Sequence, residues 1–113
     1  MLIYHLTPGT HWDSARDRGS YTTASLAAKG FIHCSSAEQV LQVANAFYQD
    51  LEDPVVLCID AGRLESPLRW EAPEGGDPFA AETFPHVYGA INLDAVVGVN
   101  VPVRGPDGLF TSW

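Results

Sequence analysis

Four histidines are the side chains of this 113-residue chain that are most able to do chemistry: His5, His11, His33 and His86. An imidazole changes charge near neutral pH, so it can transfer a proton, donate to an anion or bind a metal. The spacing of these histidines matches no local zinc motif, and neither cysteine lies at a zinc-ligand interval. We therefore expect no local metal site, and a zinc site built in three dimensions from His5, His33 and His86 stays open as an alternative.

The first candidate cluster is a short strand expected over 31–35, in which His33 and Ser35 would share one face. Ser35 or Ser36 is also expected to open a helix, and exposed N–H groups at a helix start bind anions. A phosphate or carboxylate held there would have His33 nearby as a donor. The alternative is that Ser35 only caps the helix and that His33 is a half-buried strand histidine.

The second cluster lies in the segment 68–71, which is expected to form a strand. Arg69 and Glu71 would share one face of this strand, and Trp70 would take the other. In the functional interpretation, Glu71 lies in a cleft as a general base or binds a ribose hydroxyl. In the structural interpretation, Trp70 is core and the two charged residues form a solvated surface pair.

The third cluster is the aromatic segment 84–89, in which His86 and Tyr88 would share a face. Aromatic groups beside polar ones suit stacking on a planar ring, so this segment is a candidate ligand site. The alternative is ordinary core packing for Tyr88 and a surface position for His86.

Helices are expected where apolar residues recur at helical spacing behind a capping residue. The main helix is predicted from Ser36 to Asp50, behind a capping box formed by Ser35 and Glu38. Two shorter helices are predicted, one over 11–18 capped by Thr10 and ended by Gly19, and one turn over 25–30 ended by Gly30.

Strands are expected over 2–6, 31–35, 54–60, 68–71 and 96–103. The nearly continuous apolar run 54–60 predicts a central strand that is buried on both faces. Strands do not alternate regularly with helices, so we predict an α+β fold: a small, mixed or mostly antiparallel, split β-sheet with one main helix and one or two short ones. The segment 73–85 is rich in Pro, Gly and acidic residues and predicts a surface loop, either a lid over the cleft or simply exposed.

Length and charge restrict the class of protein. The chain fits one domain, 1–113, and its net charge of −8 argues against duplex nucleic acid while leaving room for a small nucleotide-like ligand. Cys34 and Cys58 are expected to be buried thiols. The start of the chain has no leader pattern, and no apolar run approaches the roughly 20 residues that span a bilayer. We therefore expect no membrane partner and a cytoplasmic location.

Several strings, in this order, resemble the bacterial family called domain of unknown function 952: 3–5, 30–35, 37–39, 69–71, 84–89 and 92–94. The resemblance extends over nearly the whole chain. It implies an ADP-ribosyltransferase-like fold, in which two small sheets are split around a nicotinamide-dinucleotide cleft. The segment 32–35 is also similar to the His-x-Ser strand of the RNA 2′-phosphotransferases in the same broad group.

The resemblance also implies roles for individual residues. His5 would match the first-strand histidine that contacts the adenosine ribose. His33 and Ser35 would match the second-strand position near the nicotinamide. Glu71 is the best candidate for the acidic residue of the family motif.

The chain departs from the active transferases in the position of that acidic residue. In those enzymes the glutamate usually comes late in the chain, and after Tyr88 this chain offers only Asp94 and Asp107. The nucleotide-binding arginines of the RNA-modifying relatives have no obvious match either. Binding without transfer is therefore a serious alternative.

Three interpretations of function follow. The first is an NAD-utilising ADP-ribosyl- or phosphoribosyl-type transferase or hydrolase, with catalytic Glu71 and His33 and with NAD as substrate. Its substrate-binding residues would be His5, Ser35, Arg69, His86 and Tyr88. The second is a non-catalytic nucleotide-binding or regulatory domain, in which Glu71 points elsewhere or pairs with Arg69. The third is a structural or protein-interaction module with no substantial pocket and an exposed apolar patch.

Overall fold

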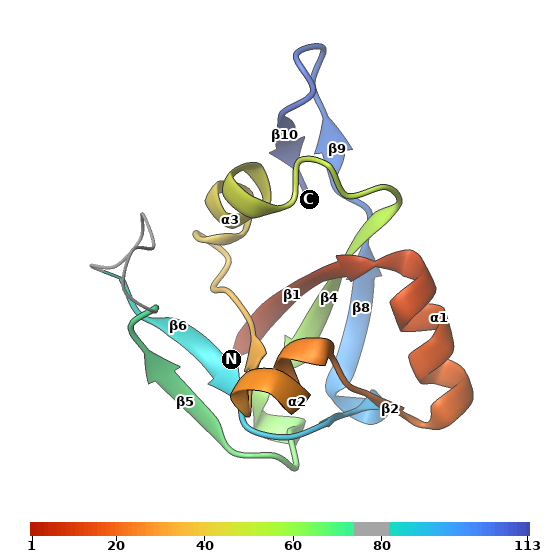
Figure 1. Ribbon diagram of the computed structural model, residues 1–113, viewed down its shortest axis with the longest axis vertical. Helices are drawn as coiled ribbons and strands as arrows, with labels where there is room; N and C mark the ends of the chain where they lie inside the picture. Colours follow the sequence, from red (N-terminus) through yellow and green to blue (C-terminus); the bar gives the residue numbers. More distant parts are fainter. Residues whose placement is uncertain (74–81) are drawn as a thin grey trace.

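Two three-stranded sheets frame the structure, and three α-helices lie around them (Figure 1). The computed structural model describes residues 1–73 and 82–113, and every count of helices and strands refers to these residues. The elements in chain order are β1 (Leu2–Pro8), α1 (Gly9–Arg18), β2 (Ser20–Tyr21), α2 (Ala24–Lys29), β3 (Ile32–His33), α3 (Val40–Phe47), β4 (Pro54–Asp60), η1 (Ala61–Arg63), β5 (Leu68–Glu71), β6 (Phe84–Val87), β7 (Ile91–Asn92), η2 (Leu93–Ala95), β8 (Val96–Asn100), β9 (Val103–Arg104) and β10 (Phe110–Ser112). The predicted α+β class is confirmed.

The first sheet has the strand order β1-β4-β8, and both of its pairings are antiparallel. Its middle strand is β4, the apolar run that was predicted to be a central strand. Successive residues of a strand point to opposite faces, and Val56 and Leu57 are both fully buried. Both faces of β4 are therefore covered at this point, as predicted.

The second sheet has the order β3-β6-β5 and is also antiparallel. Directly opposite residues of antiparallel strands share a face, so the pairs of His86 with His33 and with Arg69 place all three on one side. Trp70 takes the other side, but the structural alternative in which it is core is wrong, because it is 42% exposed. The reason is that β5 is an edge strand and Trp70 lies near its end, opposite Pro85.

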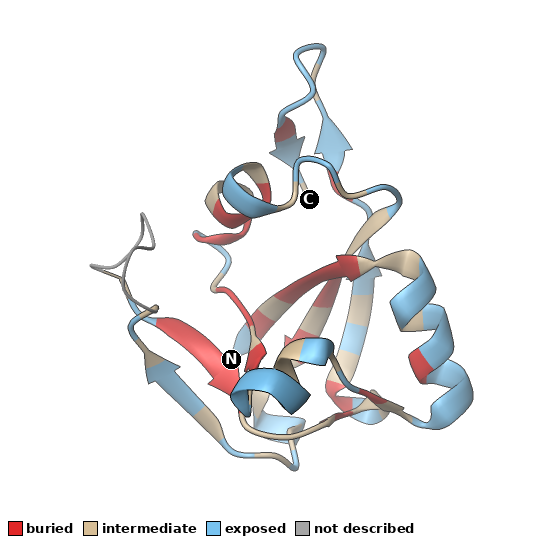
Figure 2. Ribbon diagram, in the orientation of Figure 1, coloured by how far each residue is buried: buried red, intermediate tan, exposed pale blue. Residues whose placement is uncertain are grey.

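The core joins the two sheets. One buried cluster includes Ile3 and Leu57 from the first sheet and Ile32 and Val87 from the second. A smaller cluster packs α3 against β1, β4 and β10, and Figure 2 marks the buried positions along the ribbon. Of the two thiols predicted to be buried, Cys34 is buried and Cys58 is only partly so.

The two helices that were predicted to be short, α1 and α2, end at the glycines that the sequence indicated. Gly19 follows α1 with a φ of 89°, and Gly30 follows α2 with a φ of 88°, a left-handed conformation that glycine adopts at little cost. The start of α1 differs from the prediction. Strand β1 continues as far as Pro8, which pairs with Pro54, so the helix begins at Gly9 and Thr10 is not its cap.

The main helix is shorter than predicted. α3 runs over Val40–Phe47, eight residues, whereas α1 has ten and is the longest helix in the described ranges. The predicted capping box is wrong. The Ser35 N–H donates to the Tyr4 carbonyl at 2.7 Å, and the Ser36 N–H donates to Gln39 Oε1 at 2.9 Å. Pairing with β1 thus delays the start of the helix, and these two N–H groups are not available to an anion.

The C-terminal segment is divided into more elements than predicted. The strand expected over 96–103 is two strands, β8 and β9, separated at Pro102, which has no N–H to donate to a sheet. A turn at 105–108 then returns the chain as β10, which pairs with β9. The loop predicted over 73–85 is shortened by β6, which begins at Phe84, and most of it lies outside the described residues.

Candidate functional site: a histidine-lined cleft

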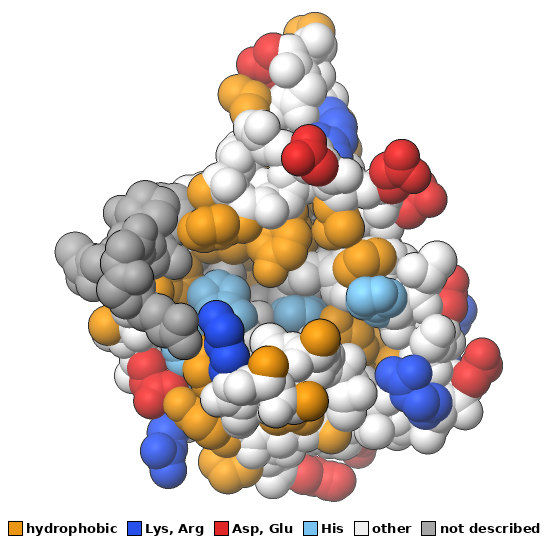
Figure 3. Space-filling view, viewed as in Figure 1, with side chains coloured by type: hydrophobic (Ala, Val, Ile, Leu, Met, Phe, Trp, Pro, Cys, Tyr) orange, Lys and Arg blue, Asp and Glu red, His pale blue; other side chains and the backbone are white. Residues whose placement is uncertain are grey.

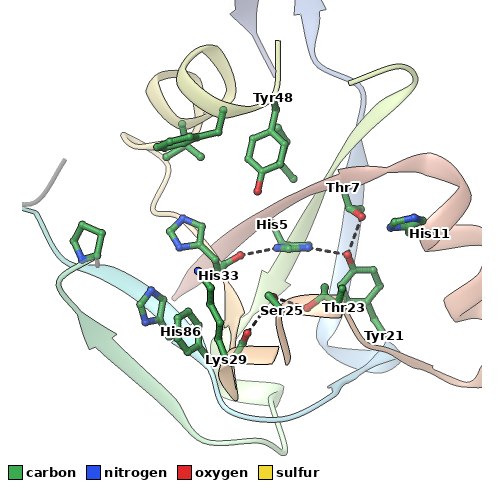
Figure 4. A pocket seen from close by; sticks show the side chains of 16 residues that line it. His5, Thr7, His11, Tyr21, Thr23, Ser25, Lys29, His33, Tyr48 and His86 are labelled. Carbon is green, nitrogen blue, oxygen red and sulfur yellow. Dashed lines mark hydrogen bonds between the residues drawn. The ribbon is translucent and has the colours of Figure 1, made fainter. Parts of the chain in front are cut away.

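A cavity of about 590 Å³ lies between the two sheets, and all four histidines of the chain line it. His5 comes from β1, His11 from α1, His33 from β3 and His86 from β6, so four elements converge here (Figure 4). In the space-filling view, histidines line a hollow that hydrophobic side chains partly surround (Figure 3). We call this cavity the histidine cleft.

The lining of the histidine cleft differs in charge from the rest of the chain. The chain carries a net charge of −8, yet no Asp or Glu is found among the described lining residues, and Lys29 is one of them. Nearby acidic side chains would repel an anion, so their absence from this described lining makes the cleft a local exception. Its chemistry suits a negatively charged ligand.

His5 forms part of the cleft wall through a buried hydrogen-bond network. Its Nδ1 lies 2.6 Å from the His33 carbonyl oxygen, and its Nε2 lies 2.7 Å from the Tyr21 hydroxyl. Burial lowers the pKa of His5 from 6.5 to about 4, so the ring is neutral at pH 7. Because a carbonyl can only accept, Nδ1 carries the proton.

The neutral tautomer of His5 decides the rest of the network. With Nδ1 protonated, Nε2 must accept, so the Tyr21 hydroxyl donates to it. The Tyr21 oxygen lies 2.8 Å from Thr7 Oγ1, and the Thr7 hydroxyl can then donate to it. Both ring nitrogens of His5 are therefore occupied, and this histidine supplies shape and rigidity to the cleft.

His86 lies in the wall formed by the second sheet, and it is buried, contrary to the alternative of a surface position. Its ring stacks on Phe31, with centroids 4.0 Å apart and an interplanar angle of 15°. Its Nδ1 lies 2.9 Å from Glu71 Oε1, and the Tyr88 hydroxyl donates to the same carboxylate oxygen. Glu71 therefore holds the orientation of a ring that lines the cleft.

Glu71 and Tyr88 affect each other's titration. The Tyr88 hydroxyl and then the His86 ring lower the pKa of the Glu71 carboxyl by hydrogen bonding to it. In turn, the Glu71 carboxylate raises the pKa of Tyr88. The guanidinium carbon of Arg69 lies 5.1 Å from the centre of the Tyr88 ring, a cation–π contact.

The predicted site residues thus fall into three groups. The histidines His5, His33 and His86 line the cleft. Glu71 reaches it through His86, while Arg69 and Tyr88 lie beside Glu71; none of these three is among the described residues that line the cleft. Ser35 is buried and pairs with Tyr4, outside the same set of lining residues.

His33 contacts residues of both sheets that border the histidine cleft. Its carbonyl accepts from His5, and its ring centroid lies 5.5 Å from that of His86 and 5.0 Å from that of Phe84. It therefore contacts the network of the first sheet through its backbone and that of the second sheet through its side chain.

Other lining residues were not singled out as site residues: His11, Tyr21, Thr23, Ser25, Lys29 and Tyr48. His11 was noted only as a histidine, and Lys29 only precedes a helix-ending glycine. Their spacing along the sequence matches no motif of a binding or catalytic site. They meet because α1, α2 and α3 all border the cleft (Figure 4).

A metal site finds no support in this geometry. Within residues 1–73 and 82–113, no group of three or more His, Cys, Asp or Glu side chains is placed to hold a metal ion. The zinc alternative from His5, His33 and His86 fails first at His5, since both of its nitrogens are already hydrogen-bonded. In the same ranges, none of the helices combines the length and apolar character needed to span a membrane.

Comparisons with known proteins identify relatives by sequence and by structure. The family model described as "Protein of unknown function (DUF952)" matches residues 6–99. The X-ray crystal structure of protein CC0527 from Caulobacter crescentus is similar, with a TM-score of 0.83 and 30% sequence identity over 98% of this chain and 94% of that one. The solution NMR structure of CC0527 gives a TM-score of 0.79 and 31% identity over 96% and 90% of the two chains. No curated protein matches the chain significantly.

Proposed function

The chain belongs to the family of proteins of unknown function DUF952, and we propose that it binds a small, ring-bearing anion of the nucleotide class in the histidine cleft. The observation that carries the proposal is the composition of the cleft. Lys29 and three histidines besides the fully hydrogen-bonded His5 meet there without an acidic side chain among the described lining residues, in a chain of net charge −8. A ligand with negative charge gains most from such a site.

The shape and aromatic content of the cleft support a planar ring as part of the ligand. The cavity volume of about 590 Å³ falls in the range of about 300–1,000 Å³ that is typical of small-molecule sites. Phe31, Phe47 and Tyr48 are among its lining residues. Aromatic walls favour stacking on a nucleobase or a nicotinamide.

NAD and ADP-ribose are the first ligands to consider. The ADP-ribosyltransferase-like interpretation expects two small sheets on either side of a dinucleotide cleft. Here β1 of the first sheet and β3 and β6 of the second border the cavity. This arrangement supports the interpretation and, with it, a dinucleotide as ligand.

Binding without transfer is the better supported form of the proposal. ADP-ribosyl transfer would need a carboxylate beside the reacting ribose. Glu71 is held by His86 and Tyr88 and is not among the described residues that line the cleft. The same contact with His86 favours transfer or hydrolysis as the second candidate, since it connects Glu71 to the cleft.

The interaction-module interpretation receives less support. It expected no substantial pocket, and the histidine cleft is a substantial one. Exposed valines do lie on β8 and the chain that follows it, Val97, Val99, Val101 and Val103.

The test is a calorimetric and thermal-shift titration of the protein with NAD, ADP-ribose, AMP and nicotinamide. Binding to the native state alone raises the melting temperature with ligand concentration. We expect saturable binding of at least one phosphate-bearing ligand, weakened up to roughly tenfold in His33→Ala, since a hydrogen bond to a neutral group of the ligand contributes roughly 0.5–1.5 kcal/mol.

The matched control is Arg16→Ala. Arg16 lies in α1, pairs with Asp13 at 3.0 Å and is not a described lining residue of the cleft. Its loss should leave binding unchanged. Absence of binding at millimolar concentrations of all four ligands would overturn the proposal, and release of nicotinamide from NAD would favour the transfer candidate.

A further inference from the structure

A second hollow adjoins the histidine cleft beside α1. Its volume is about 380 Å³, and its lining is His11, Ser14, Arg18, Thr22, Thr23 and Ala24. Three of these residues, His11, Thr23 and Ala24, also line the histidine cleft. The two hollows therefore share a border, and we call the second one the α1 groove.

One helix face forms a wall of the α1 groove. His11, Ser14 and Arg18 are spaced by three and four residues, so they lie on the same side of α1. The threonine pair 22–23 follows β2 and lies across from this face. Two separate segments thus turn polar side chains toward one hollow.

The α1 groove is cationic and rich in hydroxyl groups. Arg18 supplies a permanent positive charge and planar donors that suit a phosphate. Ser14, Thr22 and Thr23 add hydroxyls, and among the described lining residues there is neither an Asp nor a Glu. Arg18 takes part in no ion pair with a residue of the described ranges, whereas Arg16 is paired with Asp13.

The two hollows differ in what they offer to the parts of a ligand. The histidine cleft has aromatic walls at Phe31, Phe47 and Tyr48. The described lining of the α1 groove includes no aromatic residue apart from the His11 that the two hollows share. A ring therefore belongs in the cleft and a compact anion in the groove.

We infer that the ligand is a nucleoside phosphate whose ring lies in the histidine cleft and whose phosphate lies in the α1 groove, bound by Arg18 and the hydroxyls. His11, at the border, contacts the part of the ligand that joins the two. This inference rests on the proposed function, and it adds the position and chemistry of the anion. It also makes Arg18 a specificity-determining residue for phosphorylated over unphosphorylated nucleosides.

The test uses ligand pairs that differ only by one phosphate: adenosine with AMP, and nicotinamide riboside with its mononucleotide. Calorimetry at low salt should show that the phosphate increases the affinity of the wild type on the order of tenfold or more. Arg18→Ala should remove most of this increase and leave the affinity for the nucleoside unchanged. Arg18→Lys, which keeps the charge but not the planar donors, should restore part of it.

Two further variants locate the effect. His33→Ala, in the cleft, should weaken the nucleoside and the nucleotide by the same factor. Arg16→Ala, on the same helix but outside both linings, should change neither.

The outcomes separate this inference from the proposed function. If nucleosides bind but the phosphate adds no affinity, or if Arg18→Ala weakens both members of a pair equally, the inference is overturned while binding in the cleft stands. If none of these four ligands binds but NAD or ADP-ribose does, the inference alone is overturned; if NAD and ADP-ribose also fail to bind, both are overturned.

Discussion

His5 and His86 both line the histidine cleft, and both have Nδ1 in a hydrogen bond, but the partner of His5 is the His33 carbonyl and that of His86 is the Glu71 carboxylate. A carbonyl carries only a partial charge, and burial keeps His5 neutral. A carboxylate carries a full negative charge beside His86. The same side chain is therefore fixed by a backbone carbonyl in one sheet and by a side-chain carboxylate in the other.

The two histidine networks also differ in burial, and we expect one to affect stability and the other to affect ligand binding. His5 contacts Tyr21, which contacts Thr7, all within the buried part of the structure. Glu71 lies at the end of the edge strand β5, where it is accessible to water. We therefore expect changes at His5 to act on folding and changes at Glu71 to act on titration and ligand contacts.

The largest expected effect is that of His5→Ala on stability. The substitution leaves the His33 carbonyl without its side-chain donor and opens a cavity beside Tyr21, and such changes cost roughly 3–4 kcal/mol in the free energy of unfolding. Denaturant unfolding measures it. His11→Ala is the matched control, because His11 lines the same cleft but is exposed, and it should change stability by less than about 0.5 kcal/mol. Equal losses of unfolding free energy in His5→Ala and His11→Ala would contradict the structural role assigned to His5.

The second prediction concerns the pH dependence of stability. The unfolded chain protonates His5 near its ordinary pKa of 6.5, whereas the folded chain does so only near pH 4. The contribution is therefore fully present above pH 6.5 and is lost as the pH falls toward 4, by roughly 2–3 kcal/mol. Unfolding free energies measured between pH 7 and pH 4.5 should fall accordingly in the wild type and in His11→Ala. Unchanged stability over this interval would contradict the assignment of His5 as a buried neutral ring.

The smallest expected effect is a change in a single titration. Glu71 raises the pKa of Tyr88, so Glu71→Gln should lower it toward the ordinary value of 10. Ultraviolet absorbance of the tyrosinate, compared between wild type, Glu71→Gln and Tyr88→Phe, measures the shift. Glu65→Gln, an exposed change elsewhere in the chain, should leave the titration as in the wild type. No shift in Glu71→Gln would mean that the carboxylate does not hold Tyr88 in solution.

The prediction of the elements from sequence was most accurate where the signal is local. β4 and β5 have the predicted bounds, since a short apolar run between turn signals determines a strand by itself. The two glycine stops are also as predicted. α3 was extended too far, because the sequence does not show that Ser35 pairs with Tyr4 in β1.

For the site, sequence analysis identified the residue types but not their arrangement. His5, His33 and His86 were chosen and do line the cleft. Glu71 was chosen as a cleft residue, whereas it reaches the cleft through His86. The alternation of a strand predicts which residues share a face, but not which of them a neighbouring helix leaves open to a ligand.

By itself, the sequence determined the α+β class, the central strand and the helix-ending glycines, because each depends on conformational preferences or apolar patterns within a few residues. Only the tertiary structure decided that four histidines from four elements share one cleft and that Arg18 borders a groove beside it. It also decided that burial keeps His5 neutral. These properties depend on burial and on hydrogen bonds between residues far apart in the chain, and such contacts leave no local pattern in the sequence.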